Sequence, residues 1–113
     1  MPDDELVYLE KTRDSIYFNR LTFASSLLSA GGAIETCLAV ARRHVKNAIA
    51  VIRPPGHHAE YDTAMGFCLF NNVPIAARVC QQTLGDQCRK IMILDWLVTC
   101  SWSGELELAW LIG

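Results

Sequence analysis

Apolar positions between residues 22 and 43 recur at intervals of three and four. The pattern is carried by Phe23, Leu27, Leu28, Ile34, Leu38 and Ala41. This periodicity is typical of an amphipathic helix, which we predict from Thr22 to about Arg43. Gly31 and Gly32 interrupt it, and each glycine costs about 1 kcal/mol of helix propensity. We therefore expect the pair to allow close packing against a neighbouring element.

Two short apolar runs follow the helix, and each ends in residues that stop a strand or carry charge. We predict Ala48-Ile-Ala-Val-Ile52 and Ile91-Met-Ile-Leu94 as buried strands, because both are short, continuous and rich in β-branched residues. Pro54-Pro55-Gly56 ends the first run, since proline cannot donate to a strand ladder. The second run ends at Asp95, and a loop is expected over residues 54–71.

A second helix is predicted between the loop and the second strand, from Asn72 to about Leu84. Asn72 is a suitable N-cap, and Pro74 falls in the first turn, where its missing N–H costs little. The first twenty residues are polar and are expected to be irregular. The order is therefore helix, strand, loop, helix, strand. Two buried strands joined by a crossover helix predict a parallel pair in an α/β fold.

Composition limits the classes of function. The chain has 113 residues, 51% of them hydrophobic, which suits one small globular domain. Ten basic and twelve acidic residues give a net charge of −2, without the basic surface that direct nucleic-acid binding needs. The acidic start is unlike a secretory leader, and no apolar run approaches the roughly 18 residues of a membrane span. Five cysteines without a CxxC pair favour reduced thiols in cytosol or nucleus.

Candidate chemistry lies where the two predicted strands end. His57 and His58 follow the first strand and Asp95 ends the second, and parallel sheets bind ligands beyond the carboxyl ends of their strands. A carboxylate that accepts from one imidazole nitrogen prepares the other nitrogen as a general base. Gly66-Phe67 adds a place where the backbone can approach a ligand closely, beside an aromatic ring. Structural explanations stay open at this stage, because histidines in loops, aspartates at strand ends and phenylalanines commonly serve the fold alone.

Longer stretches resemble a known family. Arg53-Pro-Pro-Gly-His-His-Ala-Glu60 and Gly66-Phe-Cys-Leu-Phe-Asn-Asn-Val73 resemble the signature of class II, fungal Hda1-like zinc-dependent histone deacetylases. The similarity runs from about Asp14 to Trp96, which corresponds to the N-terminal part of the catalytic domain only. It implies a partial arginase/deacetylase-like fold, with a parallel sheet and flanking helices.

The resemblance implies roles for individual residues. His57 and His58 match the histidines of general acid–base catalysis, and Asp95 matches the carboxylate that bonds the first histidine and helps to hold potassium. The positions implied for substrate binding are Gly66, Phe67 and Ser15. In the family, zinc polarises the acetyl carbonyl of acetylated histone or other protein lysine and activates water. Family context further implies transcriptional repression, a possible co-repressor complex, and a nuclear or cytoplasmic location. From charge and composition we expect neither direct nucleic-acid nor membrane binding.

The similarity stops after Trp96. Family members continue Asp-x-Asp-x-His-His-Gly, whereas Leu97 and Thr99 stand here at two zinc-ligand positions. A zinc hydrolase needs three protein ligands and an open position, so we expect no zinc binding and no activity from this chain alone. We divide it into a partial deacetylase domain, residues 1–96, and an unrelated tail, residues 97–113, which we attribute to truncation or a gene-model error.

Two alternatives differ in class from the deacetylase. The chain could be a non-catalytic fragment or interaction module, or a relative of acetylpolyamine-type amidohydrolases. Pro54-Pro55-Gly56 together with Ala59-Glu60 favours protein lysine deacetylases over the polyamine class.

Overall fold

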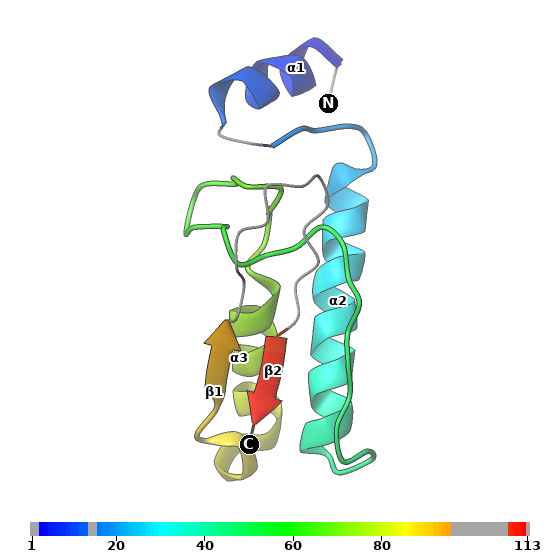
Figure 1. Cartoon of the computed structure of the whole chain (residues 1–113), viewed down its shortest axis with the longest axis vertical. Coiled ribbons are helices and arrows are strands. Elements are labelled where there is room, and N and C mark those ends of the chain that lie inside the picture. The colour runs from blue at the N-terminus through cyan, green and yellow to red at the C-terminus, as the bar shows by residue number, and fades with distance from the viewer. Residues whose placement is uncertain (1–2, 14–15, 96–108, 113) are drawn as a thin grey trace.

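The computed structural model describes residues 3–13, 16–95 and 109–112, and the helices α2 and α3 form its centre. In chain order the elements are α1 (Asp3–Thr12), α2 (Thr22–Ala41), α3 (Asn72–Leu84), the short 3-10 helix η1 (Gly85–Cys88), and the strands β1 (Met92–Asp95) and β2 (Ala109–Ile112). Figure 1 shows α1 at one end of the molecule and the two strands toward the other end.

The packing of α2 against α3 rests on small side chains. The buried residues of α2 are Ser26, Ser29, Ala30, Ala33 and Leu38. Those of α3 are Asn72, Val73, Ala76, Ala77 and Cys80. Small residues let the two helix backbones approach closely. Both helices predicted from the sequence are confirmed. Gly85, the C-cap of α3, has φ +54° and ψ −120°, a backbone conformation with positive φ that glycine adopts readily.

The predicted strand at Ala48–Ile52 does not form. The segment is irregular and runs beside α2 (Figure 1), with Ile49 and Val51 exposed by 66% and 73%. A strand needs a ladder partner for its backbone groups, and among the described residues none pairs with this segment. Instead, Ile52 packs on α2, where its Cγ2 lies 3.2 Å from the position that a Cβ on Gly32 would take. Close packing was predicted for this glycine pair and is confirmed at Gly32.

The second predicted strand forms as β1, but its surroundings differ from the prediction. It pairs antiparallel with β2, with Met92 opposite Ile112 and Asp95 opposite Ala109, and the predicted parallel pairing with residues 48–52 is not formed among the described residues. Met92, Ile93 and Leu94 are exposed rather than buried. The backbone groups of β1 form hydrogen bonds with β2, which follows β1 in the chain, whereas residues 48–52 lie along α2.

The N-terminal segment is helical, contrary to the expected irregular start. Asp4 and Glu5 lie in the first turn of α1 and Lys11 in the last, an order of charges that stabilises the helix dipole. Glu10 fixes the helix to the following segment, because its Oε1 accepts a hydrogen bond from the Phe18 backbone N–H at 2.8 Å. The helix was not predicted because its sequence has too few apolar positions to show a helical periodicity.

Helix α2 also corrects the expectation that no segment is long and apolar enough to cross a membrane. Its 20 residues pass that test by length and composition. Core helices of soluble domains pass the same test. In this structure 28% of the most apolar window of α2 is buried, and Ser29, in the middle of the helix, is buried and bonded to a neighbouring loop.

Candidate functional site

A buried polar network holds the His-His loop, which we define as residues 53–60. The Ser29 hydroxyl donates to the Pro54 carbonyl oxygen at 2.7 Å. The Asn72 side-chain amide donates to the same oxygen and to the Ser29 oxygen, both at 3.1 Å. Ser29 and Asn72 are buried, so water does not compete for these bonds. The loop is therefore fixed to α2 and α3 immediately before the histidines.

The network corrects the role predicted for Asn72. This residue is the first of α3 rather than its N-cap, which is Asn71. Gly56 closes the same contact from the loop, because a Cβ there would lie 2.4 Å from both the Asn72 backbone nitrogen and the Phe70 carbonyl oxygen. Only glycine fits between these backbone atoms. The Pro-Pro-Gly sequence thus carries a packing function in addition to ending an extended segment.

His57 and Asp95 meet across the site, as predicted, although the strand expected before His57 does not form. His57 Nδ1 lies 3.1 Å from Asp95 Oδ2. The His57 side chain is 10% exposed and that of Asp95 56%. When Nδ1 carries the proton, its N–H donates a hydrogen bond to the carboxylate. Nε2 then keeps its lone pair and can act as a base. The pair thus has the geometry of an oriented general base.

His58 lies against His57, with ring centroids 4.0 Å apart and the planes tilted by 43°. The other neighbour of His58 is Gly66, where a Cβ would lie 2.7 Å from its Cδ2 atom. The structure therefore brings together His57, His58, Asp95 and Gly66, four of the residues predicted from sequence. The His57 ring lies between Asp95 and His58, and the His58 ring lies between His57 and the Gly66 backbone.

Phe67 is presented by a tight turn. Met65 and Cys68 exchange backbone hydrogen bonds of 3.1 and 2.9 Å, and the two residues between them have φ values of +54° and +62°. Positive φ at both central positions is what a type I′ turn requires. The Cys68 Sγ donates to the Gly66 carbonyl oxygen at 3.2 Å and is buried beneath the turn.

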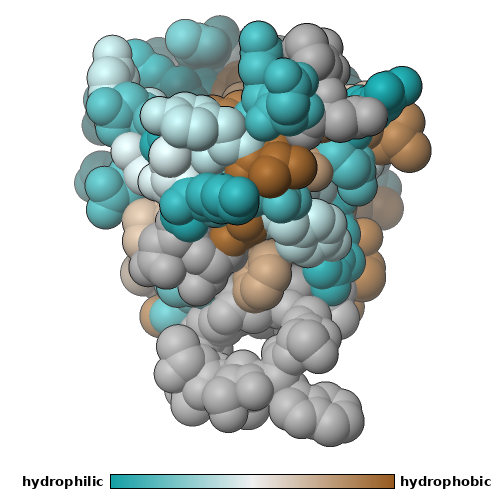
Figure 2. Space-filling view, turned by 90° about the horizontal axis from the view of Figure 1, so that it is seen from above, coloured by the Kyte–Doolittle hydropathy of each residue, from teal (hydrophilic) through white to brown (hydrophobic). Residues whose placement is uncertain are grey.

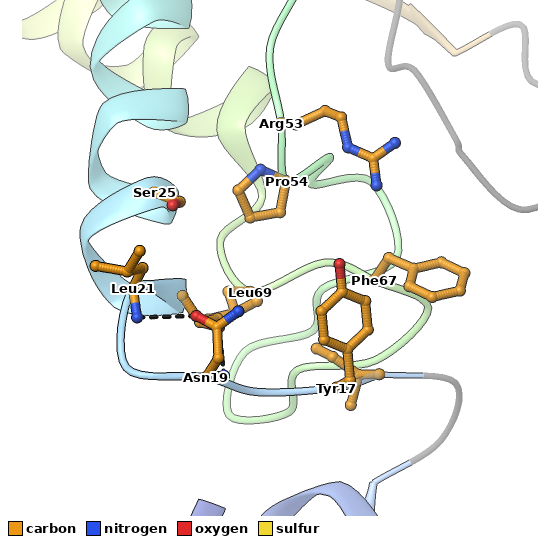
Figure 3. A pocket seen from close by; sticks show the side chains of 10 residues that line it. Tyr17, Asn19, Leu21, Ser25, Arg53, Pro54, Phe67 and Leu69 are labelled. Atoms are coloured by element: carbon orange, nitrogen blue, oxygen red, sulfur yellow. Dashed lines mark hydrogen bonds between the residues drawn. The ribbon is translucent and has the colours of Figure 1, made fainter.

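Tyr17 is a neighbour of the site that the sequence did not reveal. Its ring packs edge-on against Phe67, with centroids 6.4 Å apart. Figure 3 shows the two rings at one side of a cavity, with Arg53 and Pro54 above them. The available signal was the proximity of Tyr17 to Ser15 in the sequence, but aromatic residues are common in cores and Tyr17 follows no helical or strand periodicity.

Several predicted positions lie outside the described residues, namely Ser15, Leu97 and Thr99. Within the described part of the chain, no group of three or more histidine, cysteine, aspartate or glutamate side chains could hold a metal ion. The two positions at which the resemblance places zinc ligands, 97 and 99, lie outside this part of the chain. Leucine offers no donor atom for a metal, and threonine is a poor one.

Comparison with known proteins agrees with the resemblance. The histone deacetylase domain family matches residues 2–98. Histone deacetylase HDA1 of Saccharomyces cerevisiae is 51% identical over 96 residues, which cover 85% of this chain and 14% of that protein. Histone deacetylase clr3 of Schizosaccharomyces pombe is 49% identical over 96 residues, which cover 85% of this chain and 14% of that protein. A polyamine deacetylase of Rattus norvegicus is 46% identical over 82% of this chain and 16% of its own length.

The chain spans only about 14% of the length of the fungal relatives. The matched region contains the His-His loop, the Gly66-Phe67 turn and β1, so the likeness includes the candidate site as well as the helices that position it. This protein belongs to the histone deacetylase family, of which it carries part of the catalytic domain.

Proposed function

We propose that His57, His58 and Asp95 are the acid–base half of a lysine deacetylase site. The observation that carries the proposal is the 3.1 Å contact of His57 Nδ1 with Asp95 Oδ2, with His58 stacked at 4.0 Å on the same ring. In this role His57 Nε2 accepts a proton from water, and the Asp95 carboxylate stabilises the imidazolium that forms. His58 is the second proton-transfer group, and the resemblance also makes Asp95 a potassium ligand.

The substrate of the site is the acetylated lysine of a histone or another protein. Phe67 forms one wall for the acetyl-lysine chain, Gly66 supplies backbone beside it, and Ser15 contacts the substrate backbone at the rim. The Tyr17–Phe67 pair supports this arrangement, because the edge contact fixes the Phe67 ring. Co-repressor partners and a nuclear or cytoplasmic location belong to the same proposal.

This chain alone is inactive in the proposal. Zinc, when bound in the family, polarises the amide carbonyl and activates water. Leu97 and Thr99 stand at two of the positions where the resemblance places its ligands. Residues 1–96 are the partial catalytic domain and residues 97–113 the unrelated tail. In a complete domain, residues 48–52 and β1 are neighbours in a parallel sheet. The exposed apolar side chains at Ile49, Val51 and Leu94 support that placement, since a sheet flanked by helices would bury them.

The experiment measures zinc content and hydrolysis of an acetyl-lysine peptide with the purified chain, beside a full-length fungal deacetylase. We expect substoichiometric zinc and no turnover above a His57→Ala variant. Stoichiometric zinc together with turnover that His57→Ala abolishes would contradict the inactivity of the chain. The same assay with an acetylated polyamine tests the amidohydrolase alternative, which the similarity to a polyamine deacetylase keeps open.

An interaction module is the second candidate function. The observation in its favour is the exposed apolar surface of residues 48–52 and β1. A co-purification experiment with the full-length relative decides it. If this chain is retained by the relative and the retention is lost when Val51 and Leu94 are changed to Ser, the interaction module is supported. If the chain is not retained, the proposed binding role of this surface is contradicted.

A further inference from the structure

Positive charge is concentrated at the end of the molecule opposite α1, where Figure 1 shows both the carboxyl end of α2 and the 3-10 helix η1. Five of the ten basic residues of the chain fall in residues 42–46 and 85–90, together with one acidic residue, Asp86. We call these five side chains the basic end; they are Arg42, Arg43, Lys46, Arg89 and Lys90. All other positions together carry five basic and eleven acidic residues, so the net charge of −2 combines a positive end with an acidic remainder.

The two segments that form the basic end lie near each other. Helix α2 packs against α3, and Cys80 is buried on α3. Burial raises the pKa of the Cys80 thiol, Cys88 raises it further, and Arg42 opposes the rise. Arg42, the C-cap of α2, and Cys88, the last residue of η1, are therefore neighbours of the same thiol. The Gln81 side-chain amide donates to the Arg89 carbonyl oxygen at 3.4 Å, which ties the segment after η1 to α3.

The cationic groups of the basic end face solvent. All five residues are exposed, and in the part of the chain that the structure describes no carboxylate forms an ion pair with them. The end that carries α1 and the loops instead shows hydrophobic side chains set among hydrophilic ones (Figure 2). Cations gathered in one place create a positive potential that attracts anions, so the basic end favours a negatively charged partner.

Arg43 occupies a backbone position that suits glycine better. Its φ is +60°, in the left-handed region. The Arg43 N–H donates to the Val40 carbonyl oxygen and the His44 N–H to the Ala39 carbonyl oxygen, both at 2.9 Å, which is the pair of bonds in a Schellman motif. The residue with positive φ in this motif is usually glycine, because a Cβ is disfavoured there. The backbone thus gives no reason for arginine at position 43, and what the residue adds is an exposed guanidinium.

A short ligand rich in carboxylates fits the basic end better than an extended polyanion does. Arginine binds a carboxylate through two parallel hydrogen bonds. A long nucleic acid would reach past the basic end to the acidic remainder of the chain, and residues 42–46 and 85–90 contain no phenylalanine, tyrosine or tryptophan on which bases could stack. Membrane binding needs several apolar anchors, and Val45 is the one exposed large apolar residue of these two segments.

We propose that the basic end is a docking site for a short acidic segment of another protein, whose carboxylates bind Arg42, Arg43 and Arg89. The proposal is independent of the deacetylase function, since it needs neither zinc nor turnover, and it uses charged side chains rather than the apolar ones of residues 48–52 and β1. Arg89 and Lys90 precede β1 whereas Asp95 ends it. A segment docked at the basic end therefore leaves the His57–Asp95 pair uncovered.

The experiment titrates the full chain with a glutamate-rich peptide of about ten residues and with its glutamine counterpart, and follows backbone amide NMR signals. We expect the glutamate peptide to bind at least about tenfold more tightly, because it alone carries carboxylates. Its affinity should fall severalfold between about 0.05 M and about 0.3 M salt, since exposed charges are screened. The largest shifts should fall on residues 42–46 and 89–90.

Equal affinities of the two peptides, no dependence on salt, or shifts elsewhere on the molecule would each overturn the proposal. A short DNA duplex and phosphatidylserine vesicles test the other classes of partner. Tighter binding of either one than of the glutamate peptide would overturn the assignment to an acidic protein segment.

Arg43→Gly separates binding from folding. Glycine suits a φ of +60°, so the melting temperature in circular dichroism should stay equal or rise by up to about 5 °C. The affinity for the glutamate peptide should nevertheless fall about threefold to tenfold, because a bidentate cation is lost. Lys11→Gln, in the last turn of α1, removes the same charge at the opposite end and should change the affinity by less than about twofold. Unchanged affinity in Arg43→Gly, or an equal loss in Lys11→Gln, would contradict the docking site.

Discussion

The side-chain amide of Asn72 donates a 3.1 Å hydrogen bond to the carbonyl oxygen of Pro54, three residues before His57. Through this bond the first turn of α3 determines where the His-His loop leaves the protein core. Ser29 bonds to both partners, so α2 takes part in the same contact. Positioning of the histidines therefore depends on side chains that contact neither imidazole.

Removal of this amide should be costly. Asn72→Ala leaves the Pro54 carbonyl oxygen and the Ser29 hydroxyl with fewer partners in a buried place, and we expect a loss of about 1–3 kcal/mol in the free energy of unfolding. Denaturant unfolding measures it. Arg78→Ala, on the exposed face of the same helix, should change the stability by less than about 0.5 kcal/mol. Equal losses in the two variants would contradict a structural role for the network.

Substitution of Gly66 and of Gly31 by alanine should change the stability of the chain in opposite directions. Gly66→Ala places a Cβ 2.7 Å from His58 Cδ2 at a φ of +54°, so His58 must move. We expect it to destabilise the chain by about 1–2 kcal/mol and to shift the ring signals of both histidines in NMR spectra. Gly31→Ala meets no atom within 4 Å inside α2, and it should stabilise the chain by up to about 1 kcal/mol. A neutral Gly66→Ala would mean that the turn is not packed on His58.

The sequence predicted those elements whose periodicity is carried by their own residues. Helices α2 and α3 follow from apolar spacing, and β1 from a short run that ends in an acidic residue. Residues 48–52 have an equally good strand pattern and form none, because a strand depends on a neighbour that the pattern does not contain. The α1 helix was missed for the opposite reason, since it has charges in favourable places but few apolar positions.

The candidate site was predicted in the same uneven way. His57, His58, Asp95 and Gly66 come together as expected, although the strand predicted before His57 does not form. Asn72 was assigned to a cap, since a sequence shows that asparagine suits a helix start but not which carbonyl group its amide reaches. The contact of Tyr17 with Phe67 joins residues far apart in the sequence and could not be predicted from either.

Asp95 should matter for the orientation of His57 far more than for stability. Its side chain is 56% exposed, so water screens its attraction for the imidazole, and Asp95→Asn should cost less than about 1 kcal/mol. The same change should lower the share of His57 that carries its proton on Nδ1, because the carboxylate acceptor is lost. Long-range proton–nitrogen NMR correlations report which ring nitrogen is protonated. Asp86→Asn, in η1, is the control, and an unchanged tautomer in Asp95→Asn would contradict the pairing.

Cys37 provides a prediction about pH. Burial, with a smaller contribution from nearby Cys80, raises the pKa of the Cys37 thiol from 9.0 to about 11. At neutral pH its thiolate fraction is about a hundredfold smaller than that of a thiol with the ordinary pKa, so iodoacetamide should label native Cys37 at least about a hundredfold more slowly than the urea-unfolded chain. Mass spectrometry of the labelled peptide measures both rates. Comparable rates would contradict the raised pKa of the Cys37 thiol.

The raised pKa also fixes the direction in which stability depends on pH. The folded chain holds the Cys37 proton more tightly than the unfolded chain, so the contribution of this thiol is complete below about pH 9 and is lost as the pH rises toward about 11. The free energy of unfolding should therefore fall across this interval. The fall should be smaller in Cys37→Ala, which has no thiol to ionise at that position, although Cys80 retains a pKa raised by burial. Identical pH profiles of the two proteins would show that ionisation of Cys37 does not differ between the folded and unfolded chains.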